Sequence, residues 1–343
     1  MKRSSLFIFA AKGVLFLLSF LLIAACLYGT IWNADIVFFD LLALLLPYLV
    51  IANLFSGLLA VILRSRYFLL PVASLLIWFF TLGSFWVLSV AASDESTDDI
   101  SILSYNVQEL EGNYRMTYAE AAPKIMDFVL DQNAKIVCFQ EYANTQLTRK
   151  KMMAYPYEYH YGHTGNKTYA PMAIYSKYPI LAAGSLDFPN SNNNAIFTDL
   201  LINKDTLRVY NVHLQSLRFR AGSLKRENSV RLFNRLGKTI RKQKEQVDIL
   251  LAHTKSSPYP YIICGDFNNT QYSKVYRKLK GDLRDSFLEK GNGLGRTLLF
   301  KVLPFRIDYI LIDPDFEITS HTNYKVEYSD HYPVRASFRL PEK

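Results

Sequence analysis

Hydrophobic residues are distributed unevenly along the chain. Three apolar runs, at about 13–32, 36–63 and 67–92, each provide the roughly 20 residues that a helix needs to cross a bilayer. A core helix of a soluble protein would have a polar face, and these runs have almost no polar positions. The pattern therefore predicts a membrane region over residues 1–92 with about three transmembrane helices.

Strand-like patterns begin at residue 100. The stretch "ISILSYNV" (100–107) is β-branched and alternating, "KIVCFQE" (135–141) is continuously apolar, and the residues between them have helical spacing. Further strand-like runs, separated by Pro, Gly, Asn and Asp, lie at 171–177, 195–202, 206–214, 261–267, 306–312 and 334–340. This mixture predicts a layered α/β domain over residues 100–343 with some antiparallel strand pairing.

A long charged helix is predicted over residues 224–253, between two of the strand-like runs. Its expected buried stripe consists of Val230, Phe233, Ile240, Val247 and Leu250 or Leu251. No internal repeat of 20–50 residues is visible in the chain.

Charge predicts how the chain crosses the membrane. Cations flank the apolar runs at Lys2, Arg3, Arg64 and Arg66, whereas the loop at 33–35 has none. The N-terminus is therefore expected in the cytoplasm. Three crossings then place the acidic segment "SDESTDD" (93–99), a predicted linker, outside it. We expect a multi-pass protein of the inner (cytoplasmic) membrane with an extracytoplasmic, periplasmic C-terminal domain.

The N-terminus has a second interpretation. "MKR" with the first apolar run has the form of a secretory signal, and "LIAAC", which ends at Cys26, resembles a bacterial lipoprotein cleavage site. Removal of this segment would not change the direction of the later spans. The C-terminal domain is expected outside the cytoplasm under either interpretation.

The formal net charge is +9 at pH 7, and five cations and two anions in residues 1–93 leave +6 on residues 94–343. Basic residues cluster at 149–151, 218–231 and 241–244. Such clusters are typical of solvated surfaces, and they also suit an anionic substrate or lipid headgroups.

Polar residues that a packed core would not select stand at the ends of the strand-like runs. They are Asn106, Glu141, His213, Asp266, Asn268 and Asp308, and Asp330 and His331 precede the last run. In an open α/β sheet, ligands bind at strand ends, because loops there hold side chains over a rigid scaffold. Each residue alone is explained by a turn, but the whole set predicts an active site.

The residue types favour metal-assisted hydrolysis of a phosphate ester. The oxygen ligands of Glu141 and Asp330, with amides nearby, suit Mg²⁺ or Mn²⁺ rather than Zn²⁺. An imidazole such as His331, oriented by Asp308, can activate water or stabilise charge. His213 is then expected to face the phosphate.

Six motifs now become recognisable in a fixed order: "LSYNVQ", "FQE", "NVHL", "GDFN", "RIDYI" and "SDHYPV". Over about residues 100–340 they resemble the endonuclease/exonuclease/phosphatase superfamily, which includes deoxyribonucleases, abasic-site endonucleases, inositol-polyphosphate 5-phosphatases and neutral sphingomyelinases. The resemblance implies a four-layered α/β sandwich, with two packed mixed sheets flanked by helices. It also implies a divalent metal and hydrolysis of a phosphate ester.

On the catalytic side, the resemblance gives a role to five residues. Asp266 matches the residue that orients or activates the attacking water, and Asn268 matches its partner on the phosphate. His331 matches the catalytic imidazole, and Asp308 the carboxylate paired with it. His213 matches a position that contacts the scissile phosphate.

On the metal side, Glu141 matches the main ligand, Asn106 its neighbour and Asp330 a metal-side acid. Abasic endonucleases carry an acid two residues after the strand-end Asn, where this chain has Gln108. Glu109 would point to the other side of an extended segment. One metal-side carboxylate is therefore missing, which disfavours that branch of the superfamily.

The sequence leaves the substrate open. A lipid headgroup would favour exposed aromatic loops, for which 152–163 is a candidate, whereas nucleic acid would favour a basic groove built from Arg218, Arg220, Lys225 and Arg226. The expected partners are a phosphate-ester substrate and the lipid bilayer, without an obligate protein partner.

The leading hypothesis is a membrane-anchored, metal-dependent phosphoesterase, and an extracytoplasmic nuclease is the alternative enzyme. A non-catalytic membrane scaffold predicts gaps among the site residues, and the core set has none. A transporter would need ionisable residues inside the spans, where only Asp40 occurs.

Overall fold

The chain forms two compact units. The computed structural model describes residues 2–30, 36–83, 85–88, 95–112, 116–164, 167–218, 228–299 and 305–341. Residues 1–85, with 233–237 and 272–274, belong to the first unit, and the remaining residues belong to the second.

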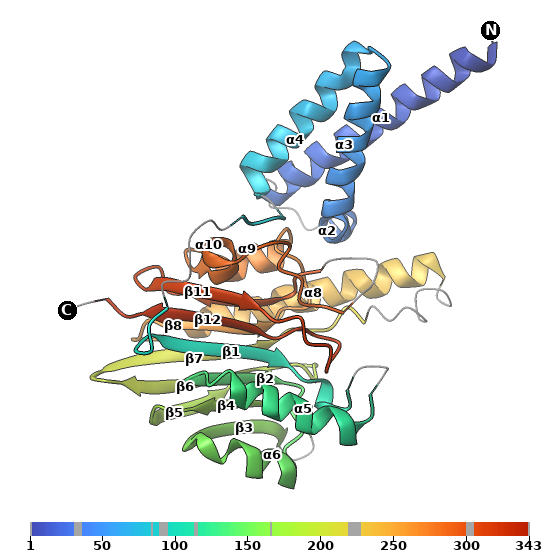
Figure 1. The fold of residues 1–343 in the computed structure, drawn as a ribbon. Coiled ribbons are helices and arrows are strands. Elements are labelled where there is room, and N and C mark those ends of the chain that lie inside the picture. The colour runs from blue at the N-terminus through green and yellow to red at the C-terminus, as the bar shows by residue number, and fades with distance from the viewer. Residues whose placement is uncertain are drawn as a thin grey trace. The chain divides into compact units, whose positions relative to one another are not determined.

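The first unit is helical. Its helices are α1 (Lys2–Thr30), α2 (Val37–Leu44), α3 (Leu46–Ile62), the short 3₁₀ helix η1 (Arg66–Phe68) and α4 (Leu69–Leu82) (Figure 1). One helix, over Phe9–Thr30, is long and apolar enough to cross a membrane. Helices α2 and α3 reach that length only together, and they meet at a bend of 72°. The helical stretch Arg66–Leu82 is shorter.

The prediction of about three continuous transmembrane helices is therefore corrected. Within the described residues there is one such helix, or two if the bent pair counts as one span. The second predicted span breaks at Leu45 because Pro47 lies in the first turn of α3. Proline has no N–H to continue the hydrogen bonding of α2, and it is favoured at the start of a new helix.

The first unit combines a buried apolar cluster with buried polar side chains, and it leaves many large apolar side chains exposed. The buried side-chain oxygen of Asn53 accepts hydrogen bonds from the hydroxyls of Ser19 at 3.0 Å and Ser74 at 3.2 Å. These three residues lie on α3, α1 and α4, so one amide joins three helices. Phe55 and Phe80, by contrast, are 69% and 79% exposed. A soluble helical bundle has the opposite arrangement.

The second unit contains two six-stranded sheets. The strands are β1 (Ile100–Asn106), β2 (Ile136–Gln140), β3 (Tyr157–Thr164), β4 (Lys167–Ser176), β5 (Ile180–Ser185), β6 (Ala195–Ile202), β7 (Asp205–His213), β8 (Tyr261–Asp266), β9 (Arg284–Asp285), β10 (Asp308–Ile312), β11 (Glu317–Asn323) and β12 (Val334–Arg339). Their orders are β11-β12-β1-β2-β4-β3 and β5-β6-β7-β8-β10-β9. Only β1–β2 and β7–β8 are parallel among the described pairs, so both sheets are mixed.

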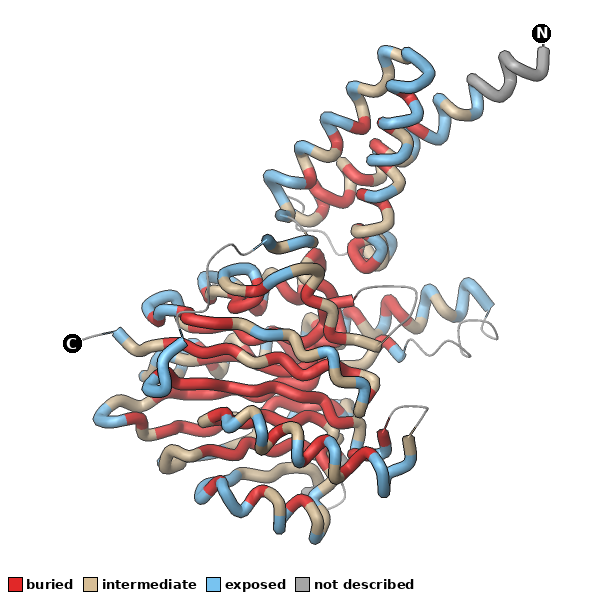
Figure 2. The backbone as a smooth tube through the Cα atoms, viewed as in Figure 1, coloured by how far each residue is buried: buried red, intermediate tan, exposed pale blue. Residues whose placement is uncertain are grey.

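Helices cover the outer faces of both sheets. They are α5 (Tyr118–Asp131), α6 (Gln146–Lys151), α8 (Ser229–Lys255) and α9 (Lys274–Lys280), and η2 (Gln108–Leu110) and η3 (Met152–Ala154) are 3₁₀ turns. Helix α10 (Ser286–Lys290) instead bridges the two sheets, since Ser286 hydrogen-bonds to Ile310 of β10 and to His321 of β11. One apolar core fills the space between the sheets, a second joins α5 to the first sheet, and a third joins α8 and α9 to the second. The strands carry most of the buried residues (Figure 2). The predicted pair of packed mixed sheets flanked by helices is confirmed.

Helix α8 differs from its prediction in its buried stripe. Ile240, Val247 and Leu250 are buried as expected, but Val230 is 67% exposed and Phe233 is 41% exposed. At 3.6 residues per turn, Val230 lies about 120° around the helix from Leu236, where the buried stripe begins. The expected positions 224–227 lie outside the described residues.

The segment before β1 is attached to the second unit at two points. The backbones of Val87 and Gly293 exchange hydrogen bonds of 2.9 and 2.8 Å. The carboxylate of Glu95 then accepts hydrogen bonds from Ser320 and Ser337, both at 2.9 Å, and pairs with Arg335. Residues 93–94 of the predicted linker lie outside the described residues.

Candidate active site

Strand register brings the predicted site residues to one edge of the sandwich. In the second sheet, Asp266 at the end of β8 lies opposite both His213, which ends parallel β7, and Asp308, which begins antiparallel β10. In the first sheet, Asn106 ends β1 beside Gln140 at the end of parallel β2, and Glu141 follows. The two sheets therefore present their polar strand ends at the same edge.

Glycine is required directly before Asp266. Gly265 has a φ of +129°, and a Cβ at this position would lie 2.0 Å from the carbonyl oxygen of Val212 on β7. No side chain fits this close approach of two backbones. In "GDFN", Gly265 therefore allows the close contact between β7 and β8, and this contact places the carboxylate of Asp266.

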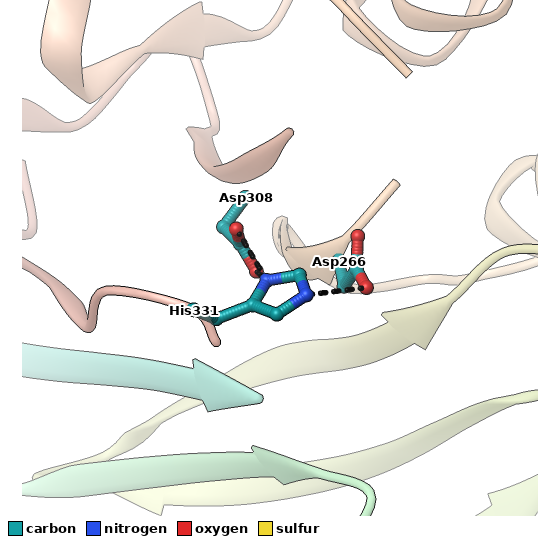
Figure 3. Close-up of side chains that lie close together, drawn as sticks. All are labelled: Asp266, Asp308 and His331. Carbon is teal, nitrogen blue, oxygen red and sulfur yellow. Dashed lines mark hydrogen bonds and ion pairs between the residues drawn. The ribbon is translucent and has the colours of Figure 1, made fainter. Parts of the chain in front are cut away.

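His331 and Asp308 form a buried pair at this edge (Figure 3). The Nδ1 atom of His331 lies 2.9 Å from Oδ2 and 3.1 Å from Oδ1 of Asp308. A carboxylate only accepts hydrogen bonds, so Nδ1 carries the proton and donates it. The other ring nitrogen, Nε2, lies 3.7 Å from Oδ2 of Asp266. One imidazole thus connects two carboxylates.

Burial and charge shift the pKa values of this group. Burial alone would lower the pKa of His331, but the carboxylates of Asp308 and Asp266 outweigh it and hold the pKa well above its usual value. Burial raises the pKa of Asp266, and repulsion from Asp308 adds to the rise against the attraction of His331. The site therefore holds a cationic imidazole next to a carboxylate with raised proton affinity.

Asn106 connects Asp266 to Glu141. Its side-chain nitrogen donates to Oδ2 of Asp266 at 3.1 Å and to Oε1 of Glu141 at 3.2 Å. Its side-chain oxygen accepts a hydrogen bond of 3.1 Å from the backbone N–H of Gln108. Asn106 was predicted as a neighbour of the metal, and here its amide nitrogen orients both carboxylates.

His213 faces the same carboxylates without a hydrogen bond of its own. It is 2% exposed, and its Nε2 atom lies 3.4 Å from Oε1 of Glu141 and 3.7 Å from Oδ2 of Asp266. Neither ring nitrogen has a hydrogen-bond partner among the described residues. Burial lowers the pKa of this imidazole. A buried donor without a partner costs stability, and such groups concentrate where a ligand supplies the partner.

Asn268 holds Asp266 in place. Its backbone N–H donates to Oδ1 of Asp266 at 2.8 Å, and its side-chain nitrogen donates to Oδ2 at 3.0 Å and to the carbonyl of Leu214 at 2.9 Å. The predicted phosphate partner is thus also the residue that fixes the orientation of the Asp266 carboxylate.

Three residues that follow site strands have left-handed backbone conformations. The φ angles are 49° at Gln108, 50° at Glu141 and 50° at Asn268. The segment after Asn106 is therefore a tight turn, and the expectation that Glu109 continues an extended segment is wrong. Gln108 occupies the position where abasic endonucleases carry the additional acid. Its side-chain amide lies within hydrogen-bond distance of Asp330.

The donor set fits a hard divalent cation. Glu141 and Asp330 offer carboxylate oxygens, which Mg²⁺ and Mn²⁺ prefer. Burial raises the pKa of Asp330, and the charge of Glu141 adds to the rise, so a nearby cation would relieve a real electrostatic cost. Asp266, Asp308 and His331 also offer ligand atoms within 4.8 Å of one another. In that group, however, Asp308 and Nδ1 of His331 already bind each other.

Thr297 is a residue that the sequence reasoning missed. Its buried hydroxyl accepts hydrogen bonds from the backbone N–H groups of Ile307 at 2.9 Å and Asp308 at 3.0 Å. Its carbonyl accepts the N–H of Tyr332 at 2.7 Å. One threonine thus ties the backbone of Asp308 to the segment that carries His331. No local motif marks it, because it lies in a loop that pairs with His331 only in the fold.

A model of the endonuclease/exonuclease/phosphatase family matches residues 103–331, a range that begins just before Asn106 and ends at His331. The chain belongs to the endonuclease/exonuclease/phosphatase family. Members of this family are phosphoesterases and nucleases, and they generally use a divalent metal. None of the proteins with curated functions matches this chain in sequence.

Solved structures of this family share the fold at low sequence identity. The mannosyl-6-phosphatase of Bacteroides thetaiotaomicron is 18% identical with a TM-score of 0.55, and the match covers 70% of this chain and 100% of that one. The human Nocturnin catalytic domain is 15% identical with a TM-score of 0.55, with 72% and 96% covered. D. rerio TDP2 with a single-stranded DNA product is 19% identical with a TM-score of 0.53, with 71% and 99% covered.

Proposed function

We propose that this chain is a divalent-metal-dependent phosphoesterase, anchored in a membrane with its catalytic domain outside the cytoplasm. The buried His331–Asp308 pair, with Nε2 of His331 directed to Asp266, carries the proposal. A second buried imidazole, His213, stands at the same edge with unpaired ring nitrogens. Such a set suits an anionic substrate that brings its own hydrogen-bond acceptors.

The residues divide the work of hydrolysis. Asp266, with its raised proton affinity, takes the proton of the attacking water as the new oxygen–phosphorus bond forms. The cationic His331 donates from Nε2 to a phosphate oxygen and stabilises the developing charge, and Asp308 keeps the imidazole charged and oriented. His213 donates to a remaining phosphate oxygen, and Asn268, whose amide hydrogens bind Asp266 and Leu214, keeps the Asp266 carboxylate oriented towards the water. The ester bond to the leaving oxygen then breaks, that oxygen takes a proton from solvent water, and Asp266 releases its own proton to solvent.

Glu141 and Asp330, with Asn106 nearby, would hold the divalent cation, Mg²⁺ or Mn²⁺. The cation supplies charge that neutralises phosphate oxygens. Without it, Glu141 and Asp330 would repel an anionic substrate, and metal dependence follows from this charge balance.

The arrangement of the first unit supports the membrane anchor. In a bilayer, apolar side chains face lipid, and small polar residues such as Ser19, Asn53 and Ser74 join helices inside the bundle. The segment Phe9–Thr30 is long enough to cross by itself. With a cytoplasmic N-terminus, any odd number of crossings leaves the catalytic domain outside. A C-terminal reporter that functions only in the cytoplasm should therefore be inactive. Activity of such a reporter would contradict this topology.

The enzymatic proposal is tested with the full chain in detergent. The panel consists of DNA, RNA, sphingomyelin, glycerophospholipids, inositol phosphates and a mannose 6-phosphate ester, each with Mg²⁺, with Mn²⁺ and with chelator. We expect chelator-sensitive release of product from one class, abolished by Glu141→Ala and by His331→Ala. His160→Ala, which removes an imidazole of β3 outside the site, is the matched control and should keep full activity. Hydrolysis that survives in His331→Ala at the wild-type rate would overturn the mechanism.

A further inference from the structure

The first half of helix α8 carries charge of one sign. Residues 229–244 contain six cations and no acid, namely Arg231, Arg235, Lys238, Arg241, Lys242 and Lys244. The second half of the same helix is mixed, with Glu245, Asp248 and Lys255. A face that served only for solubility would mix signs along its whole length, as the second half does. The first half therefore requires a more specific explanation.

Helical spacing gathers these cations on one side. Residues 231, 235, 238 and 242 follow the i, i+4, i+7, i+11 pattern of a single face. Arg231, Lys238 and Arg241 are exposed, and none of the three makes an ion pair within the parts of the chain that the structure describes. We call this surface the α8 basic face and define it by Arg231, Lys238 and Lys242, with Arg241 at its border, about 80° around the helix from Arg231.

Exposed apolar side chains accompany the cations on this half of α8. Val230 is 67% exposed and Phe233 is 41% exposed, although both were expected in the core. A basic helix with exposed apolar residues has the composition of a segment that lies at a bilayer surface, with cations on headgroups and apolar side chains among acyl chains. Binding to nucleic acid would require the cations but would gain little from an exposed valine.

Helix α8 is connected to the catalytic edge. Gln243, in the turn that ends this half of the helix, donates to the carbonyl of Asn268 at 3.2 Å and accepts from the side chain of Asn269 at 2.8 Å. The ammonium group of Lys242 binds the carbonyl of Asn190. The buried side of α8 therefore supports the loop that orients Asp266, while the α8 basic face points to another side of the same helix.

We propose that the α8 basic face binds the anionic headgroups of the membrane in which the chain is anchored. The inference rests on the membrane anchor of the proposed function. Only four residues separate Leu82, the end of α4, from Val87, which already pairs with Gly293 of the catalytic unit. Under the proposed anchor, this short connection would keep the catalytic unit within reach of the bilayer surface.

The test uses the full chain in nanodiscs of phosphatidylcholine, with or without phosphatidylglycerol, and follows backbone hydrogen exchange. We expect the backbone amides of residues 229–244 to exchange about fivefold more slowly in the anionic discs than in the neutral discs, the effect of one strong contact between a Lys or Arg and the surface. This protection should vanish at high salt. The combined variant Arg231→Glu, Lys238→Glu, Arg241→Glu should lose this protection. The matched control reverses three exposed cations elsewhere, Lys124→Glu, Lys150→Glu and Lys255→Glu, and should keep it.

The outcomes separate the two proposals. Incorporation into neutral discs tests the anchor, and hydrolysis of a small soluble phosphodiester, which the triple variant should leave unchanged, tests the enzyme. Equal exchange in neutral and anionic discs would overturn the role of the α8 basic face, even if both other tests succeed. Loss of DNA or RNA cleavage in the triple variant, without any effect of lipid charge, would overturn it in favour of a nucleic-acid surface.

Discussion

The Nδ1 atom of His331 lies 2.9 Å from Oδ2 of Asp308, and the two residues come from different segments that meet only in the folded chain. This contact fixes the orientation of the imidazole and leaves its Nε2–H for the proposed phosphate ester. It also gives the site its charge at neutral pH, because the carboxylate holds the pKa of His331 high.

Asp308→Asn should separate these two effects. An amide keeps the size of the side chain but removes its charge, so we expect turnover to fall by about 100-fold or more. The pKa of His331 should fall, which moves the alkaline limb of the pH–rate profile to lower pH. A wild-type profile in the variant would show that Asp308 does not act on the imidazole.

Thr297→Val should lower turnover without removing any group that touches substrate. The valine has the same shape but leaves the N–H groups of Ile307 and Asp308 without an acceptor. A small displacement of Asp308 is expected to reduce kcat by about tenfold or more with little change in KM. Thr297→Ser, which restores the hydroxyl, should recover kcat. A purely structural role would lower thermal stability in the valine variant and leave kcat of the folded protein unchanged.

Gly265→Ala should destabilise the second unit strongly. The new Cβ would meet the backbone of Val212 rather than a movable side chain, so β7 and β8 must separate. We expect a loss of about 3 kcal/mol or more in the free energy of unfolding. Gly281 also has a positive φ, but its Cβ would meet no atom closer than 4.0 Å. Gly281→Ala should therefore cost only about 1 kcal/mol, and equal losses in the two variants would exclude the steric explanation.

His321 should make stability depend on pH below neutrality. Burial lowers its pKa to about 4 from the ordinary histidine value of 6.5, and its ring nitrogens lie 2.8 Å from the hydroxyl of Ser286 and 3.1 Å from Oδ1 of Asn323. Between these two pKa values the unfolded chain binds a proton that the folded chain does not. The contribution of His321 to the free energy of unfolding is therefore fully present above about pH 6.5. It is lost as the pH falls towards 4, and the loss is at most about 3 kcal/mol.

Thermal unfolding of the wild type and of His321→Gln between pH 8 and pH 4 measures this contribution. The variant should be less stable at pH 8 and should show a shallower loss of stability on acidification. Parallel curves would assign the acid sensitivity to other groups.

Much of the fold was predictable because buried strands leave continuous or alternating apolar patterns. The polar residues that interrupt those patterns, such as Glu141 and Asp266, mark strand ends, and parallel strands bring such ends together. The pairing of β10 with β8 is what adds Asp308 to the set. The register of β10 against β8 is decided by contacts between residues that are far apart in the sequence.

Other features depend on contacts that leave no local signal. Thr297 lies in a loop whose partners are 10 and 11 residues away and in the segment after His331. Pro47 marks the break at Leu45 in the sequence. The prediction of one continuous span over 36–63 followed hydropathy alone and so missed this break. Val230 and Phe233 are apolar residues that the fold leaves outside, and an apolar pattern cannot distinguish burial in a core from contact with another partner.

Gln108, Glu141 and Asn268 adopt left-handed backbone conformations. For residues other than glycine, such a conformation costs about 1–2 kcal/mol per residue. A glycine at position 141 would relieve that strain and would delete a carboxylate that the proposed reaction needs. Selection of variants for heat resistance alone is therefore expected to favour glycine at this position, and the proteins it enriches would be more stable and inactive. The loops that carry the proposed catalytic residues are the same loops that limit how stable the chain can become.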